Sequence, residues 1–368
     1  MNKKIISLML VLTLVLTVLV GCGDGKGKDV GNTPENVTED GAAGSGDEKV
    51  KIAIVHKNLG DLGFVDESHI GLNEAKDKLG IEFDYAEIVD ISEVEMQLRM
   101  FADSEEYDLI IALGADYIDP IIAAAADYPE QKFTLADGVV EGYENIHSIR
   151  ALDPEQTFLS GVIAGLVTKD ERMPLANKEN IIGFVGGMDT PVSRSGAAGF
   201  MAGAKYVNPE VEFIYNIVGS YTDPGTAKEI AMTAYGRGAD VISHNAGGSG
   251  LGVFNAAEES NKYVIGSSKA SIDPERSLVT SLKRIDLLIY QEIENVQNGT
   301  WKPGVTLKGI KDDVCGYDRT GINTEIPQDI IDIAEEVKQQ YFDGKFELPQ
   351  DPDEINEWTK NNNYEKNK

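Results

Sequence analysis

The glycine-rich stretch between residues 238 and 254 carries the residues whose types and spacing best suit the binding of a small molecule. Residues 240–245 are predicted as a short buried strand and residues 251–260 as a helix. The turn between them contains Gly247, Gly248, Gly250 and Gly252. Glycines let a ligand approach the main chain, helix starts present free N–H groups, and open α/β sheets bind ligands at the carboxyl ends of strands. The turn therefore predicts a binding site lined by backbone, although a tight turn that binds nothing has the same signature.

The chemistry available to this turn is narrow. Its Gly248-Ser-Gly250-Leu-Gly252 core is neither the Gly-x-Gly-x-x-Gly of a dinucleotide site nor the Gly-Lys-Ser/Thr ending of a phosphate-binding loop. The chain has no Gly-x-Ser-x-Gly elbow of a serine hydrolase. Its four histidines, His56, His69, His147 and His244, show no metal-binding spacing. We therefore expect a binding protein with no catalytic residue, no metal and no cofactor.

Carboxylates follow several other predicted strands or lie in neighbouring loops. Those of Asp66, Asp116 and Asp137 can accept hydrogen bonds from the hydroxyl or amine groups of a ligand. Each of them can equally cap a helix or remain solvated. Asp153 precedes a proline and a predicted helix, so capping explains it better than ligand contact.

Cationic and aromatic candidates are fewer. Lys269 follows a predicted strand and Arg194 lies in a predicted helix; each could pair with an anionic group of the ligand or lie on the surface. Phe64, Tyr117 and Tyr221 are loop aromatics that could form a wall of the site.

Alternating strands and helices must position these residues. Strands are predicted at 50–56, 83–88, 108–113, 132–136, 181–185, 211–217, 240–245 and 262–266. Helices are predicted at 67–79, 92–103, 118–128, 155–169, 193–207, 225–236 and 251–260. The alternation occurs twice, over about 50–150 and 180–270, and is typical of parallel sheets flanked by helices. Two α/β lobes with a ligand cleft between them are therefore expected.

The carboxyl-terminal third continues the pattern less regularly. We predict a helix over 283–296, extended strands between 304 and 316, and a helix over 326–342. Residues 350–368 are polar and are expected to fray.

The amino terminus indicates export. Lys3 and Lys4 precede a mostly apolar run, residues 5–20, that is typical of a secretory signal. The run ends in Leu-Val-Gly-Cys22, which resembles the bacterial lipobox, whose cysteine is lipidated; an ordinary anchor helix is the alternative. Residues 23–48 are polar and are predicted to form a flexible tether. The formal net charge of −29 argues against nucleic acid as a partner.

Several segments together resemble the basic membrane protein family, the substrate-binding lipoproteins of ABC importers that include purine-nucleoside receptors. The matching segments are Gly63–Ser68 with Gly71-Leu72, Phe158–Gly165, Ile182–Met188, Ala198–Phe200 with Ala202-Gly203, Gly219-Ser220, Gly238–Ile242 and Ala246–Phe254. The resemblance implies a two-lobed periplasmic-binding-protein fold of the sugar-receptor type, with three chain crossings between the lobes. It also implies a lipid anchor on the extracytoplasmic face, an ABC permease as partner, a nucleoside-like ligand and a monomer.

With this resemblance the lobes and the site can be assigned. The first lobe comprises 49–154 and about 284–320, the second 155–283 and about 321–349, and 350–368 form a tail. The predicted ligand-binding residues are Phe64, Asp66, Ser68, His69, Gly114, Asp116, Asp137, Met188, Arg194, Gly247, Gly248 and Lys269.

The chain departs from the family pattern at several ligand positions. Asp66 and Ser68 are kept, but His69 stands at an aromatic position. The family's Arg-Phe-Glu falls on 195–197, which read Ser-Gly-Ala, and its acidic loop falls on 267–271, which read Ser-Ser-Lys-Ala-Ser. Weak nucleoside binding or a different small polar ligand is therefore expected. A ligand sensor of the same fold and, less favoured, a nucleoside-processing enzyme such as a hydrolase or a dehydrogenase are the alternatives to a transport receptor.

Overall fold

The computed structural model describes residues 49–269 and 271–364. The predicted signal segment, the lipidated Cys22 and the tether lie outside the described residues. Among the described residues, no helix combines the length and apolar character needed to cross a bilayer.

The first sheet has six strands in the order β11-β5-β4-β3-β1-β2, all paired in parallel. They are β1 (Lys51–His56), β2 (Glu82–Glu87), β3 (Leu109–Leu113), β4 (Phe133–Ala136), β5 (Ile146–Ala151) and β11 (Gly304–Lys308). Its helices are α1 (Phe64–Leu79), α2 (Val94–Asp103), α3 (Ile118–Asp127) and α8 (Ile285–Gln297). Ile52 and Ile54 belong to one core and Ala53 and Val55 to another, so β1 is buried on both faces, as a central parallel strand must be.

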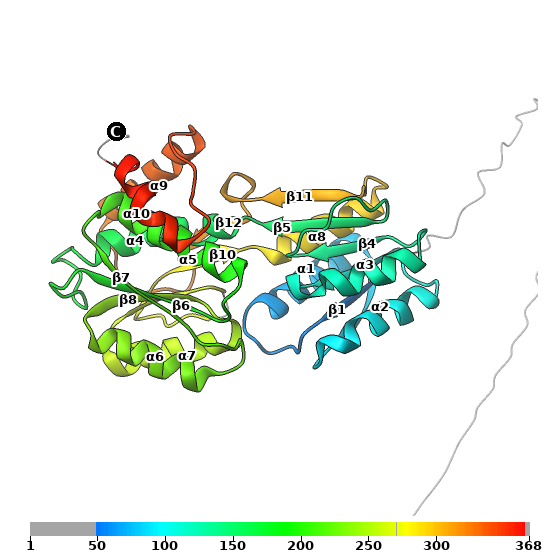
Figure 1. The fold of residues 1–368 in the computed structure, drawn as a ribbon, viewed down its shortest axis with the longest axis horizontal. Helices are drawn as coiled ribbons and strands as arrows, with labels where there is room; N and C mark the ends of the chain where they lie inside the picture. Colours follow the sequence, from blue (N-terminus) through cyan, green and yellow to red (C-terminus); the bar gives the residue numbers. More distant parts are fainter. Residues whose placement is uncertain (1–48, 270, 365–368) are drawn as a thin grey trace, which may run out of the picture. The chain divides into compact units, whose positions relative to one another are not determined.

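The second sheet has the order β12-β10-β9-β8-β6-β7, and only the β10–β12 pair is antiparallel. Its strands are β6 (Ile181–Gly186), β7 (Glu212–Ile217), β8 (Ala239–Asn245), β9 (Tyr263–Gly266), β10 (Ser277–Lys283) and β12 (Cys315–Asp318). Helices α6 (Pro224–Gly236) and α7 (Gly250–Ser260) lie along one side, and α4 (Asp153–Val167) and α5 (Pro191–Val207) along the other (Figure 1). We call each sheet with its helices a lobe. Two parallel-dominated sheets flanked by helices confirm the predicted two-lobed α/β fold.

Helices α4 and α5 pack with almost no side chain between their backbones. A Cβ atom at Gly161 would lie 2.1 Å from the carbonyl oxygen of Phe200, and one at Gly203 would lie 2.0 Å from that of Phe158. Real side chains never approach backbone so closely, so only glycine permits this contact. The segments around 158–165 and 198–203 that resemble the family therefore build the core of the second lobe.

The chain passes between the sheets three times, as the resemblance implies. The crossings follow β5, β10 and β11, and they are joined by hydrogen bonds from Leu152 N to Lys308 O (2.9 Å) and from Arg284 N to Val314 O (2.8 Å). The buried Glu155 carboxylate accepts from Ile310 N at 2.6 Å and is packed so tightly that a Cβ at Gly309 would lie 2.1 Å from it. These contacts fix the paths of the crossing segments.

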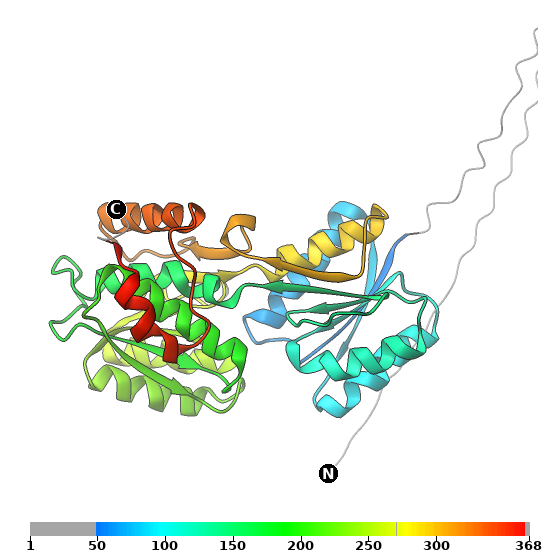
Figure 2. The same cartoon turned by 45° about the horizontal axis from the view of Figure 1, so that its top comes forward.

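Five details differ from the sequence-based expectations. Strands β5 and β10 were not predicted, and α1 begins at Phe64, not at residue 67. The extended region at 304–316 is divided between the two sheets, because β11 joins the first and β12 the second. The tail is not frayed where it is described: α10 (Ile355–Asn361) buries Ile355 and places Trp358 at 6.0 Å, centroid to centroid, from Tyr206. Figure 2 shows α10, in red, beside α5, while α9 (Gln328–Phe342), in orange, lies over the same side of the lobe.

Candidate functional site

Buried charges from both lobes meet where the chain crosses between the lobes after β5 and after β10. Lys283, the last residue of β10, places its Nζ atom 2.6 Å from Asp137 Oδ1 and 3.0 Å from Asp153 Oδ1. Asp137 follows β4 of the first lobe, and Asp153 opens α4 of the second. Arg150 of β5 also pairs with Asp153. We call Asp137, Arg150, Asp153 and Lys283 the interlobe cluster.

The electrostatics of this cluster depend on burial. Only 7% of Asp137 and 2% of Asp153 is exposed, so water stabilises neither carboxylate well. Burial raises the pKa of Asp137, and Lys283 opposes that rise. Burial alone would lower the pKa of Lys283, but Asp137 and Asp153 outweigh it and raise that pKa, so the ammonium stays charged.

Asp137 also carries backbone strain. Its φ is +70°, a left-handed conformation that costs a non-glycine residue about 1 kcal/mol or more. Its Oδ1 atom lies close to Lys283 but outside hydrogen-bond geometry, and no other described group donates to it. A buried acceptor held in a strained conformation is typical of a binding site.

Tyr221 covers the two glycine turns of the second lobe. A Cβ at Gly187 would lie 2.4 Å from its ring, and one at Gly247 would lie 3.5 Å from its Cβ. Burial raises the pKa of the Tyr221 hydroxyl, which is hydrogen-bonded to Thr190. Lys57 of the first lobe lies 5.8 Å from the ring centroid, so the ring faces the other lobe.

The glycines after β8 divide into two pairs. Gly250 and Gly252 serve packing, because Cβ atoms there would lie 2.2 Å from the His244 ring and 2.0 Å from the Pro224 carbonyl. Gly247 and Gly248 open a single 3₁₀ turn before α7, and within the described residues their N–H groups have no hydrogen-bond acceptor. Only this pair retains donors for a ligand.

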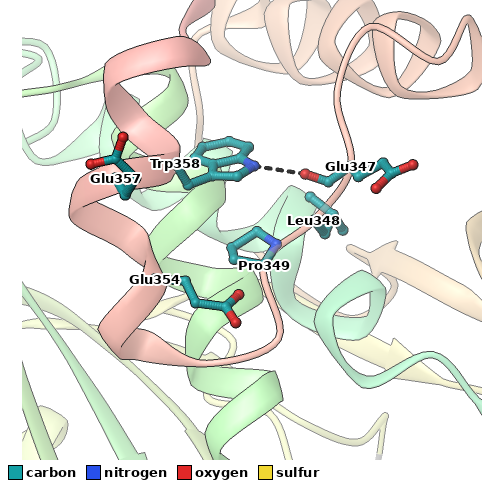
Figure 3. Close-up of a pocket in the computed structure, with 6 residues that line it drawn as sticks. All are labelled: Glu347, Leu348, Pro349, Glu354, Glu357 and Trp358. Carbon is teal, nitrogen blue, oxygen red and sulfur yellow. Dashed lines mark hydrogen bonds between the residues drawn. The ribbon is translucent and has the colours of Figure 1, made fainter.

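Two surface hollows lie away from these residues. One, of about 350 Å³, surrounds Trp358, whose indole N–H donates to the Glu347 carbonyl at 2.6 Å (Figure 3). The other, of about 290 Å³, lies between α4 and α9. None of the predicted ligand-binding residues lines either hollow. Over residues 49–269 and 271–364, no three His, Cys, Asp or Glu side chains are grouped to hold a metal ion.

Residues 49–343 match the family model described as ABC transporter substrate-binding protein, PnrA-like. The chain belongs to this family. Its members are substrate-binding proteins, not a class of enzymes.

Named relatives and a solved structure extend the match. The ABC transporter nucleoside-binding protein BmpA of Lactococcus lactis is 28% identical, over 95% of this chain and 99% of that protein. An uncharacterized lipoprotein of Pyrococcus abyssi is 29% identical, over 80% of this chain and 79% of that protein. The crystal structure of an ABC transporter solute-binding protein from Aeropyrum pernix K1 has a TM-score of 0.75 and 26% identity, and the similarity covers 84% of this chain and 96% of that one.

Three residues predicted from the family's first loop are engaged within the first lobe. The Asp66 carboxylate accepts from the backbone N–H groups of Gly60 (2.8 Å) and Leu62 (2.9 Å) and so orders that loop. Ser68 is buried and donates to the Val65 carbonyl at 2.7 Å. His69 shares a 2.8 Å contact between Nε2 atoms with His56. These side chains shape the loop, and within the described residues no hydrogen bond or ion pair joins them to the interlobe cluster.

The remaining predicted residues are distributed over both lobes. Phe64 lies beside the cluster, with Lys283 Nζ 5.7 Å from its ring centroid, and Asp116 pairs with Lys57 at 2.8 Å. Gly114 has a φ of +135° that favours glycine. Arg194 binds Asp351 through two hydrogen bonds of 2.6 and 2.7 Å. Met188 and Lys269 are exposed.

Lys283, at the centre of the cluster, is absent from the residues that the sequence predicts. Residues 283–296 were expected to form one helix, whereas Lys283 ends β10 and α8 begins at Ile285. A strand prediction for 277–283 would have put this lysine at a carboxyl strand end, where ligands bind in such sheets.

Proposed function

We propose that this protein is a lipid-anchored receptor on the extracytoplasmic face that binds a small, uncharged polar molecule and delivers it to an ABC permease. The interlobe cluster carries the proposal for the ligand site. Lys283 is shared by a carboxylate of the first lobe and one of the second, so a molecule that inserts there would touch both. Contact with both lobes is what hinge closure around a ligand requires.

Charge balance supports an uncharged ligand. The cations of the interlobe cluster are Arg150 and Lys283, and their partners are Asp137 and Asp153. An anionic or cationic ligand would have to break one of these pairs and leave a buried charge unmatched, which is costly. Adjacent carboxylate and ammonium groups can instead accept from and donate to neighbouring hydroxyls of a sugar.

Aromatic and backbone groups support a ligand with a flat part. Tyr221 and Phe64 offer rings from opposite lobes, and Gly247 and Gly248 offer N–H donors. A nucleoside or a related base-plus-sugar molecule has the matching groups, and a relative bears the name of a nucleoside-binding protein. Because His69 turns toward His56, it cannot stack on a base in this arrangement, which favours weak nucleoside binding or a related ligand.

The anchor rests on the amino-terminal sequence. The Leu-Val-Gly-Cys22 ending is followed by 26 residues before the described body begins, enough for a tether. A relative named as a lipoprotein supports attachment through Cys22.

Mass spectrometry of molecules released on denaturing freshly purified protein tests the ligand class. Calorimetry with that molecule and with adenosine, guanosine, inosine and uridine then measures affinity. Lys283→Met removes a charged hydrogen-bond donor, worth about 1.5–3 kcal/mol, and should weaken binding roughly 10- to 100-fold. Lys132→Met, at an exposed position before β4, is the control and should bind normally. Unchanged affinity in Lys283→Met would refute this placement of the site, and a charged released ligand would refute the ligand class.

A further inference from the structure

Glu67 joins the two lobes beside the interlobe cluster. It lies in the first turn of α1, in the first lobe, and its carboxylate is hydrogen-bonded to the Ser268 side chain and the Lys269 backbone, both in the loop after β9 of the second lobe. Ser271 of the same loop donates from its hydroxyl to the Leu62 carbonyl at 3.1 Å, next to α1. The start of α1 is therefore held by the other lobe at two places.

The backbone around this contact is prearranged. Leu62 has a φ of +49°, which is rare for leucine, and its N–H is held by Asp66 at 2.9 Å. A Cβ at Gly71 would lie 2.3 Å from the Asp286 carbonyl, so α1 is pressed against the start of α8 one turn after Glu67. This close approach brings the carboxylates of Glu67 and Asp286 near one another.

We propose that Glu67 is a proton-linked latch: the lobes close with its carboxyl group held against Ser268 and Lys269, and closing takes up a proton there. The proposal goes beyond solute binding, because it adds a condition, the surrounding pH, under which the receptor closes.

The charged groups that face Glu67 lie on α1 itself, at the start of α8 and in the loop after β9. Asp286 at the start of α8 disfavours a second negative charge, while the Lys269 ammonium favours it weakly. Arg284 also senses Glu67 and Glu74 of α1, but its guanidinium already makes hydrogen bonds of 2.8 Å to both oxygens of Asp286. Burial dominates this balance and raises the pKa of Glu67 from an ordinary value of 4.5 to about 7.

The direction of the pH effect follows from the thermodynamic coupling between proton binding at Glu67 and closing of the lobes. In separated lobes Glu67 is solvated and regains its ordinary pKa, whereas in closed lobes its pKa is about 7. Closing is then favoured by lower pH, by about tenfold per pH unit between those two values, and the preference is lost as the pH rises through 7. Above pH 7 the closed form must hold a charged carboxylate in a poorly solvated position.

The test measures the distance between the lobes without a ligand. Fluorophores attached at Lys132→Cys and Glu258→Cys, both exposed positions on different lobes, report energy transfer in the full chain held in detergent from pH 5 to pH 8. Cys315 is 4% exposed and should not react with the labels. The closed fraction should fall as the pH rises toward 7 and should become independent of pH in Glu67→Gln. Asp77→Asn, which removes an exposed carboxylate from the same helix, should behave like the parent protein.

The Ser268→Ala variant provides a second test, which is valid even if the Glu67→Gln variant fails to fold. The Ser268 hydrogen bond lowers the pKa of Glu67, so its loss should move the pH midpoint upward. A distance that is independent of pH in the parent, a pH response that survives in Glu67→Gln, or an unmoved midpoint in Ser268→Ala would each overturn the proposal. Because no ligand is used, such a failure would leave the proposed transport role unaffected.

Discussion

Replacing Gly203 with alanine should destabilise the second lobe, although alanine is the better helix former. Gly203 lies in α5, where an added Cβ would be 2.0 Å from the Phe158 carbonyl oxygen and 2.8 Å from the Val162 nitrogen of α4. Ordinary contacts lie at 3.4–4 Å, and both atoms belong to helix backbone, so the two helices must separate by more than about 1 Å.

The size of the effect comes from two opposing terms. Overpacking a dense core typically costs 1–3 kcal/mol, and contact with backbone places this case near about 3 kcal/mol. Alanine returns about 1 kcal/mol through its higher helix propensity. We therefore expect Gly203→Ala to lower the free energy of unfolding by about 2 kcal/mol.

Gly236→Ala is the matched control. Gly236 ends α6, and a Cβ there would meet no atom within 4 Å, so the exchange should be neutral or stabilise by up to about 1 kcal/mol. Urea denaturation followed by tryptophan fluorescence reads both variants, because Trp301 lies in the first lobe and Trp358 in the second. Equal midpoints for Gly203→Ala and the parent, or an equal loss in Gly236→Ala, would refute the reasoning about backbone contact.

Two further outcomes are expected from residues outside the proposed site. Glu292→Ala should lower the stability of the first lobe by at least about 3 kcal/mol, because the buried carboxylate accepts from His147 Nδ1 and from Trp301 Nε1, both at 2.9 Å; an unchanged Trp301 transition in urea would contradict this. Cys22→Ser should release the protein into the medium or stall its processing, as fractionation and mass spectrometry would show. A fully processed variant that stays in the membrane would argue against the lipid anchor.

The strands that local sequence pattern predicts are those whose side chains are apolar. Residues 109–113 read Leu-Ile-Ile-Ala-Leu and are buried throughout, so the pattern alone identifies β3. Strand β5 was missed because it buries His147 and Ser148, and β10 because it buries Ser277, Thr280 and Ser281. Their partners are distant in sequence: Ser281 pairs with Ser160 of α4 at 2.7 Å, and His147 pairs with Glu292. When a polar side chain is buried because of a partner distant in sequence, the local sequence shows no apolar pattern that predicts a strand.

The same limit applies to the candidate site. Asp137 could be predicted because it follows a recognisable strand, whereas Lys283 could not, because β10 itself was missed. Asp66 was predicted as a ligand contact, and its carboxylate accepts from backbone N–H groups of its own loop. The type and position of a residue can mark it as a candidate site residue. They do not reveal which group its side chain binds.

The glycines show how the family fold can be kept while residues at the predicted ligand positions change. A Cβ atom at Gly161, Gly203 or Gly252 would lie 2.0–2.1 Å from backbone of a neighbouring helix, so these positions are fixed by packing within the second lobe and not by what is bound. The departures at 267–271 lie in the loop after β9, whereas those at 195–197 lie in α5, where Ser195 and Ala197 are buried. In the loop after β9, Ser268 binds Glu67 of the other lobe. Under the two proposals above, the loop that holds the opposite lobe sets how readily the receptor closes, and the interlobe cluster sets which ligand it closes on. Affinity and specificity can then change separately on one scaffold.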